Sequence, residues 1–193
     1  MPTARIVCTG DELVRGLRIN TNAAYLAKEL CGLGILPTAH VAVSDNQEDI
    51  EAALACAAAE ADVVLVTGGL GPTEDDRTRH ALAAYLGQPH EENADALQSI
   101  QQRLSHYGRG LSESQHRQAL LPNSAEWLPN SVGTAPGIHC RHDGAEIFCL
   151  PGPPAELEPM FTNCVAPRLK EIAGDELLVS ASLHTFGAGE ATV

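Results

Sequence analysis

The sequence predicts an α/β fold in which helices cover both faces of a mostly parallel sheet. Short apolar, β-branched runs alternate with segments of helical periodicity in the first half of the chain. Each expected strand passes directly into a polar loop of small residues, as strands do at the carboxyl edge of parallel sheets. The 193 residues, 44% of them apolar, suffice for one core and hardly for two.

The first half of the chain contains three strand–helix units. The expected strands are Ala4–Cys8, Leu36–Val43 and Asp62–Val66, and the expected helices are Asn20–Leu33, Gln47–Ala59 and about Asp75–Leu86. Asn20 or Thr21 caps the first helix, and Gly34 and Gly87 end the first and the third. Repeated strand–helix units of this kind predict parallel strands joined by crossover helices.

The second half is less regular. We expect helices over Glu91–Ser105, Glu113–Leu120 and from the PGPPAE segment to about Ile172, a strand at Glu126–Leu128, and a hairpin of Gly137–Arg141 with Ala145–Leu150. One domain therefore covers residues 1–172. The tail, residues 173–193, begins like another strand, and we expect it to be the start of a following domain.

Composition and charge narrow the class of protein. A net charge of −13 argues against a nucleic-acid partner, because such proteins carry a basic face. No segment reads as a signal peptide or is apolar enough to span a membrane. The six cysteines have no zinc-site spacing, which favours free thiols in a reducing compartment. We expect a cytoplasmic protein that acts on a small molecule.

Residues 67–78, TGGLGPTEDDRT, combine a glycine loop with three consecutive carboxylates. Glycines here let backbone amides face an anion, and the following helix offers its N-terminus. The loop is neither a Walker A motif nor a Rossmann fingerprint, and a tight turn that packs a strand against a helix is the alternative. The residues assigned to ligand binding here are Thr67, Gly68, Gly69, Leu70, Gly71, Pro72 and Thr73.

Carboxylates follow three of the expected strands. Asp11 follows the first, Asp45 the second, and Asp75 and Asp76 the third, so all four are expected at one edge of the sheet. Acids beside a phosphate-binding loop imply a divalent cation, normally Mg²⁺ or Mn²⁺, between them. The alternative is that these acids are solvated or cap helices, and Thr73 and Asp76 have an approximate capping-box spacing.

Two further loops are stiff enough to line a pocket for a flat heterocycle, although both are equally suited to be rigid connectors. They are Gly133, Thr134, Ala135 and Pro136 in the GTAPG segment, and Pro151, Gly152 and Pro153 in LPGPPAE.

Five segments together resemble a known family. TGDELVRGLRINTNAAYLAKEL, VSDN, TGGLGPTEDDRT, QALLPNSAEWLPNSVGTAPG and LPGPPAELEPM, in this order, closely resemble the N-terminal domain of the CinA family (competence/damage-inducible protein A) over about residues 4–170. That domain is itself similar to the MoaB/MogA molybdopterin-binding fold. The resemblance implies a three-layer αβα domain that forms a dimer, as in CinA proteins, or a trimer, as in the MoaB/MogA relatives.

The resemblance also implies an activity. In CinA proteins this domain is associated with metal-dependent ADP-ribose pyrophosphatase activity, whereas the deamidase activity belongs to a separate C-terminal domain and is not expected here. In the MogA relatives the matching loops bind and adenylylate molybdopterin, and acids at the positions of Asp45 and Asp76 matter for that reaction. Those relatives carry GGTG and an arginine–aspartate pair where this chain has GGLG and Asp75-Asp76. This difference favours the CinA interpretation.

We therefore expect a hydrolase that splits the pyrophosphate of ADP-ribose or a similar dinucleotide with Mg²⁺, Mn²⁺ or Co²⁺. Asp11, Asp75 and Asp76 are assigned to the metal, Asp45 and Asp76 to catalysis, and Asn20 and Asn22 to the ligand. Two alternatives stay open. One is a module that binds a nucleotide or molybdopterin without turnover, and the other is an oligomerisation domain of a longer protein.

Overall fold

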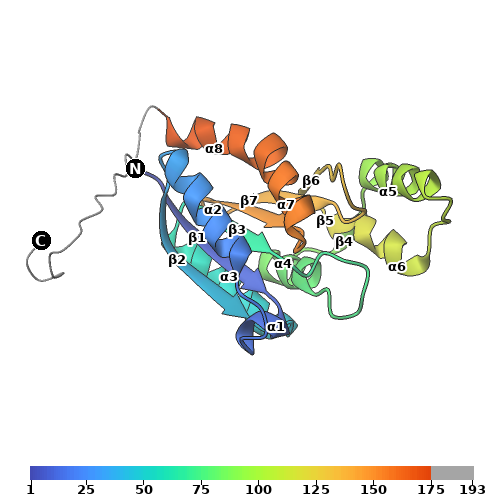
Figure 1. The fold of residues 1–193 in the computed structure, drawn as a ribbon, viewed down its shortest axis with the longest axis horizontal. Helices are drawn as coiled ribbons and strands as arrows, with labels where there is room; N and C mark the ends of the chain where they lie inside the picture. The colour runs from blue at the N-terminus through green and yellow to red at the C-terminus, as the bar shows by residue number, and fades with distance from the viewer. Residues whose placement is uncertain (175–193) are drawn as a thin grey trace, which may run out of the picture.

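The computed structural model describes residues 1–174, and its centre is a six-stranded sheet (Figure 1). Its strands are β1 (Thr3–Thr9), β2 (Leu36–Val43), β3 (Val63–Thr67), β6 (Glu126–Leu128), β7 (Gly137–His142) and β8 (Ala145–Leu150). They lie in the order β2-β1-β3-β8-β7-β6. Four of them are parallel, and β7 runs antiparallel to both β8 and β6. The predicted mostly parallel sheet is confirmed.

Helices cover both faces of this sheet (Figure 1). On one face lie α2 (Thr21–Gly32), α7 (Pro154–Met160) and α8 (Ala166–Ala173), and on the other lie α3 (Gln47–Glu60) and α4 (Thr78–Leu86). Val63 and Leu65 of β3 pack into the first layer and Val64 and Val66 into the second. Because β3 is covered on both sides, its sequence is a continuous apolar run. The three-layer αβα architecture is confirmed.

A smaller lobe stands at one side of the sheet (Figure 1). It contains the antiparallel pair β4 (His90–Glu92) and β5 (Leu120–Pro122), the helices α5 (Ala94–His106) and α6 (Glu113–His116), and a 3₁₀ turn η1 (Arg117–Ala119). The helix expected from Glu91 therefore begins at Ala94, because Asn93 caps it by accepting a hydrogen bond from the Ala96 N–H. The helix expected over Glu113–Leu120 is α6 followed by η1.

The helix after the glycine loop also begins later than predicted, at Thr78 instead of Asp75. Asp76 Oδ2 accepts hydrogen bonds from the N–H (2.8 Å) and the hydroxyl (2.5 Å) of Thr73, so it closes a turn before the helix and does not cap it. The acidic run consequently lies in a loop at the edge of the sheet.

Two local features complete the chain. The β7–β8 hairpin turns through Asp143 and Gly144, both with positive φ, which is the backbone that an Asp-Gly turn provides. A π segment, η2 (Phe161–Val165), lies between α7 and α8 and ends two residues before Pro167, which has no N–H to donate to the preceding turn. No helix within residues 1–174 has the length and apolar character needed to cross a membrane.

Because β3 lies in the centre of the sheet, truncating one of its buried side chains should destabilise the protein more than a truncation on an edge strand. Leu65→Ala removes a side chain that is 0% exposed and should lower the free energy of unfolding by about 3–5 kcal/mol. Val41→Ala, on edge strand β2 where Val41 is 45% exposed, should cost less than about 1 kcal/mol. Urea denaturation of both variants measures the difference, and equal costs would contradict the assignment of β3 to the middle of the core.

Candidate functional site

The loops singled out in the sequence meet at one edge of the sheet. β1, β2, β3 and β8 are parallel, so they end at the same edge. β6 ends there too, and β7, being antiparallel, begins there, which brings residues 129–136 to the same edge. Between these loops lies a cavity of about 450 Å³, called here the acidic cavity. Its lining comprises Thr9, Gly10, Glu12, Asp45, Gly68–Thr73, Asp75, Asp76, Gln118, Thr134, Ala135, Pro151–Pro153 and Glu156.

The glycine loop leaves no room for side chains at its start. Gly68 and Gly69 have φ of +104° and +65°, which L side chains rarely adopt. A Cβ on Gly68 would lie 2.5 Å from Thr9 Oγ1, and one on Gly69 would lie 2.3 Å from Thr78 Oγ1. Thr78 in turn donates its hydroxyl to the Gly68 carbonyl at 2.8 Å. β1, β3 and α4 therefore hold the loop in one conformation.

The loop presents unpartnered backbone donors. Within residues 1–174, the N–H groups of Gly69, Leu70 and Gly71 form no hydrogen bond, whereas the Gly68 N–H donates to Leu150 O. Consecutive free amides in a turn of this kind form a concave site that suits an anion.

A buried arginine supports the loop from behind. Arg79 is 4% exposed, and its Nη1 donates to the Leu70 carbonyl at 2.6 Å, while Nη1 and Nη2 both reach the Gly71 carbonyl at 3.3 Å. Burial lowers the pKa of Arg79 to about 10, which still leaves the guanidinium charged at neutral pH. Its bonds to the carbonyls hold these two peptide groups in place.

The acidic cavity is lined by five carboxylates and, among the described residues, by no lysine, arginine or histidine. The acids are Glu12, Asp45, Asp75, Asp76 and Glu156. Burial raises the pKa of Asp45, and the nearby Asp11, Glu12 and Asp75 carboxylates raise it further, against a hydrogen bond from the Asp11 N–H that lowers it. The acids are thus close enough to repel one another.

Asp11, one of the three predicted metal ligands, does not line this cavity. Its Oδ2 accepts a hydrogen bond from Arg15 at 2.5 Å, and its Oδ1 accepts one from the Asp45 N–H at 3.4 Å. Asp45 Oδ2 accepts one in return from the Asp11 N–H at 3.0 Å. Asp11 therefore joins the loops after β1 and β2, and the next residue, Glu12, faces the cavity in its place.

A second cavity of about 420 Å³, called here the adjacent cavity, shares Thr9, Glu12, Gly152 and Pro153 with the first. Its own lining comprises Leu13, Arg18–Asn22, Thr67 and Pro154. Asn22 Nδ2 donates to Thr67 Oγ1 at 3.0 Å and to the Gly152 carbonyl at 2.8 Å. The predicted ligand residues are thus divided between two neighbouring cavities, while Gly133 and Pro136 line neither.

Besides Thr9, Gly10 and Glu12, the site residues missed in the sequence include Gln118, Asn130 and Glu156. Gln118 is fully buried in the wall of the acidic cavity; its Nε2 donates to the Leu70 carbonyl, and its Oε1 has no partner in the described chain. Asn130 donates to Glu156 Oε2 and to the Ala135 carbonyl, which fixes the GTAPG loop against Glu156. Gln118, Asn130 and Glu156 lie within the segments that carry the family resemblance, but polarity alone does not distinguish them from surface residues.

The acids of the cavity fit a metal ion only if other ligands complete its coordination. Among residues 1–174, no group of three or more His, Cys, Asp or Glu side chains is arranged to hold a metal ion by itself. A divalent cation such as Mg²⁺ is commonly held by one or two carboxylates, water and the phosphate oxygens of the ligand. The hard oxygen donors of this cavity fit that arrangement.

The fold and the cavity define an αβα domain with its candidate ligand site at the carboxyl edge of the sheet. Comparison with known proteins agrees: residues 5–171 match the family described as "Probable molybdopterin binding domain", and the chain belongs to it. Within it, the chain is a member of the CinA family. A crystal structure of "the protein CinA with unknown function" from Thermoplasma acidophilum is 34% identical, with a TM-score of 0.79, over 83% of this chain and 94% of that chain.

Two further comparisons show how much of the related proteins this chain covers and where the similarity concerns only the fold. A "CinA-like protein" of Nostoc punctiforme is 39% identical over 193 residues, which is 99% of this chain but 46% of that protein. The chain therefore spans about half the length of the curated relatives it matches. The MoaB enzyme of Thermus thermophilus is 20% identical, with a TM-score of 0.57, over 91% of this chain and 98% of that chain, and this likeness concerns the fold alone.

The glycine loop can be tested directly. Gly69→Ala forces a side chain onto a positive φ and against Thr78, so we expect a loss of about 2 kcal/mol or more and a melting temperature lower by roughly 4–8 °C. Gly32→Ala at the exposed end of α2, where a Cβ meets nothing within 4 Å, should be neutral or stabilising. Calorimetry compares them, and an unchanged Gly69→Ala variant would show that the loop is not held as described.

The raised pKa of Asp45 predicts a pH-dependent stability. Because the charged form is disfavoured in the folded protein, it costs stability above the folded pKa, and the cost disappears as the pH falls through that pKa. Asp45→Asn should therefore raise the melting temperature at pH 8 by about 1–3 °C, and this gain should vanish under acid conditions.

The matched control is Asp143→Asn, at the β7–β8 turn on the opposite edge of the sheet, which should show no such gain. A lower melting temperature of the Asp45→Asn variant at pH 8 would mean that the Asp45 charge is compensated in the folded protein.

Proposed function

We propose that this domain binds the pyrophosphate of ADP-ribose, or of a similar dinucleotide, together with a divalent cation in the acidic cavity, and hydrolyses it. One observation carries the proposal: within residues 1–174, five carboxylates and no cationic side chain line the cavity, beside three backbone amides without a partner. Without a cation, the carboxylates would repel the anion for which the amides are suited. If the anion enters together with Mg²⁺, Mn²⁺ or Co²⁺, the cation binds the carboxylates and the anion binds the backbone amides.

Each group then has a distinct role. The N–H groups of Gly69, Leu70 and Gly71 donate to phosphate oxygens and stabilise the charge that develops there. Glu12, Asp75 and Oδ1 of Asp76 would hold the cation, since Asp76 Oδ2 is already engaged by Thr73. When bound, the cation neutralises the phosphates and polarises the phosphoryl group.

Asp45 would act as the general base. Its raised pKa makes it a better proton acceptor than an ordinary aspartate. In the proposed step, the oxygen of water forms a bond to one phosphorus, the bridging P–O bond breaks, and Asp45 accepts the proton of the water. The products from ADP-ribose are AMP and ribose 5-phosphate.

The adjacent cavity would take one nucleoside of the ligand. It opens off the acidic cavity through shared residues, so a molecule with a phosphate centre can extend into it. Ile19, Pro153 and Pro154 supply apolar surface, and Arg18 supplies a charged donor. Asn22 Oδ1, which has no partner in residues 1–174, is available to accept a hydrogen bond from the ligand.

The family match favours a second candidate, a module that holds molybdopterin or a nucleotide without turnover. In that case the same amides bind the terminal phosphate of the pterin, and Asp45 has no catalytic part. We further propose that the domain works in the cytoplasm as a dimer or trimer.

Release of AMP from ADP-ribose, with Mg²⁺, Mn²⁺ or Co²⁺ against EDTA, distinguishes the two candidates. We expect metal-dependent turnover that falls at least about a hundredfold in Asp75→Asn, because this change removes a cation ligand but no contact of the fold. Asp143→Asn should retain full activity. Saturable binding of ADP-ribose without AMP would support the second candidate, and neither binding nor turnover would contradict both.

A further inference from the structure

A third cavity of about 290 Å³ lies behind the acidic run. It shares Pro72, Thr73 and Asp76 with the acidic cavity, so the turn formed by these residues separates the two. The rest of its lining is Glu74, Arg77, Arg79, His80 and Arg117. It is called here the arginine cavity, and nothing in the proposed hydrolysis uses it.

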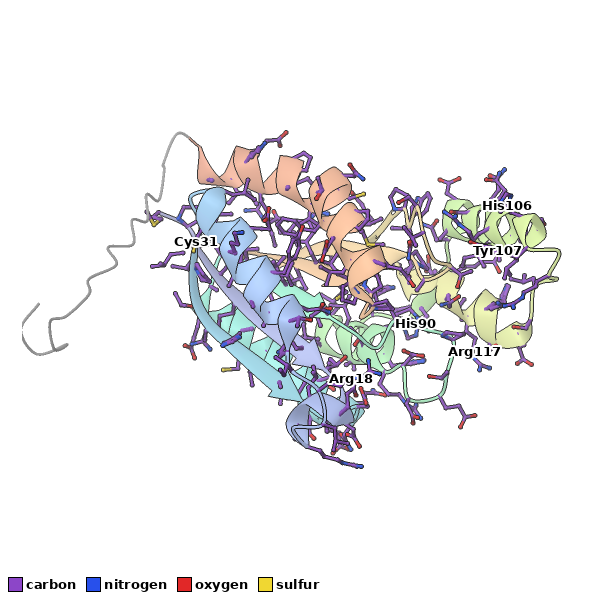
Figure 2. The ribbon with its side chains drawn as sticks, in the orientation of Figure 1. Arg18, Cys31, His90, His106, Tyr107 and Arg117 are labelled. Atoms are coloured by element: carbon purple, nitrogen blue, oxygen red, sulfur yellow. The ribbon has the colours of Figure 1, made fainter. Side chains whose placement is uncertain are left out.

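The concentration of positive charge at this place is unusual for the chain. The protein has 12 lysines and arginines against 25 acids, yet three of those 12 line this one small cavity. They come from separate elements: Arg77 and Arg79 flank the start of α4, and Arg117 begins η1. Figure 2 shows Arg117 and His90 on the side of the molecule that carries β4, β5 and α6, away from Arg18.

These cations are incompletely paired. The Arg77 side chain forms no hydrogen bond or ion pair within residues 1–174. Arg117 is 3.8 Å from Glu113, whose side chain is 91% exposed, so that pair is weak. Arg79 bonds only to carbonyls, and its Nε–H has no partner in the described chain.

The electrostatics of His80 agree with this picture. Burial lowers the pKa of His80, and the charges of His90, Arg79, Arg77 and Arg117 lower it further. The His80 and His90 rings also meet edge to face, 4.9 Å apart. Besides burial, which is the larger cause, the basic neighbours disfavour the protonated form of His80, and this agrees with the excess of cationic side chains around the cavity.

Two acids, Glu74 and Asp76, line the same cavity. Asp76 Oδ2 is occupied by Thr73, and Glu74 lies exposed at the rim with no ion pair in residues 1–174. Three arginines therefore face two carboxylates, and within residues 1–174 neither carboxylate is hydrogen-bonded or ion-paired to an arginine. Arginine guanidinium groups are the donors with which proteins commonly bind phosphate.

We propose that the arginine cavity is a second, metal-independent site for a phosphate dianion, held by Arg77, Arg117 and the Nε–H of Arg79. The site does not depend on the hydrolysis proposed above. Because its wall is the turn that carries Thr73 and Asp76, its occupation bears directly on the loop of the acidic cavity. The dianion is either free phosphate or a phosphomonoester.

The test is calorimetric titration of the full chain with inorganic phosphate, and separately with AMP, at pH 8 in EDTA. Chelation leaves the acidic cavity without a cation, so its carboxylates oppose an anion there. We expect saturable binding that weakens at least about tenfold in the double variant Arg77→Gln/Arg117→Gln. Both residues are exposed, so the variant should fold, which its melting temperature verifies.

Arg109→Gln, in the exposed loop after α5, is the control for the loss of a positive charge and should bind as the wild type does. Binding of phosphate alone would assign the site to the free anion, and binding of AMP as well would extend it to monoesters. No binding in EDTA, binding retained by the double variant, or an equal loss in Arg109→Gln would each overturn the proposal.

Discussion

The packing of Gly68 and Gly69 between Thr9 and Thr78 is the constraint on which the site depends. A strand that ends at the carboxyl edge of a parallel sheet must turn sharply to reach the next helix, and here the turn passes too close to β1 and α4 for any Cβ. The backbone that results leaves the amides of Gly69, Leu70 and Gly71 without partners in the part of the chain that the structure describes. The close approach that requires glycine here is therefore also what leaves these amides available for the proposed anion.

Negative and positive side chains lie on opposite sides of this loop. Five carboxylates lie in the acidic cavity on one side, while Arg79 bonds to the loop carbonyls and Arg77 and Arg117 line the cavity behind the acidic run. The carboxylates oppose an anion unless a cation accompanies it, whereas the arginines attract one directly. The two proposals thus assign phosphate to two neighbouring places in a chain whose net charge is −13, by different means.

Much of this arrangement could be predicted from the sequence, because β3 is a continuous apolar run and the loops that follow parallel strands must meet at one edge of the sheet. The sequence could not distinguish Asp11 from Glu12, since which of two adjacent acids faces a cavity depends on backbone geometry at α1 (Asp11–Val14). Nor could it show that Asp76 closes a turn with Thr73, or that Gln118 is buried with a free Oε1. These features arise from contacts between residues far apart in the chain.

The central claim is that an anionic ligand enters the acidic cavity only with a divalent cation. Titration of the full chain with ADP-ribose, in Mn²⁺ and in EDTA, tests it most directly, with the Arg77→Gln/Arg117→Gln variant used throughout so that the arginine cavity cannot contribute. We expect saturable binding in Mn²⁺ and none in EDTA. Equal affinity in both conditions would contradict it, because the five carboxylates would then require no cation beside a bound phosphate.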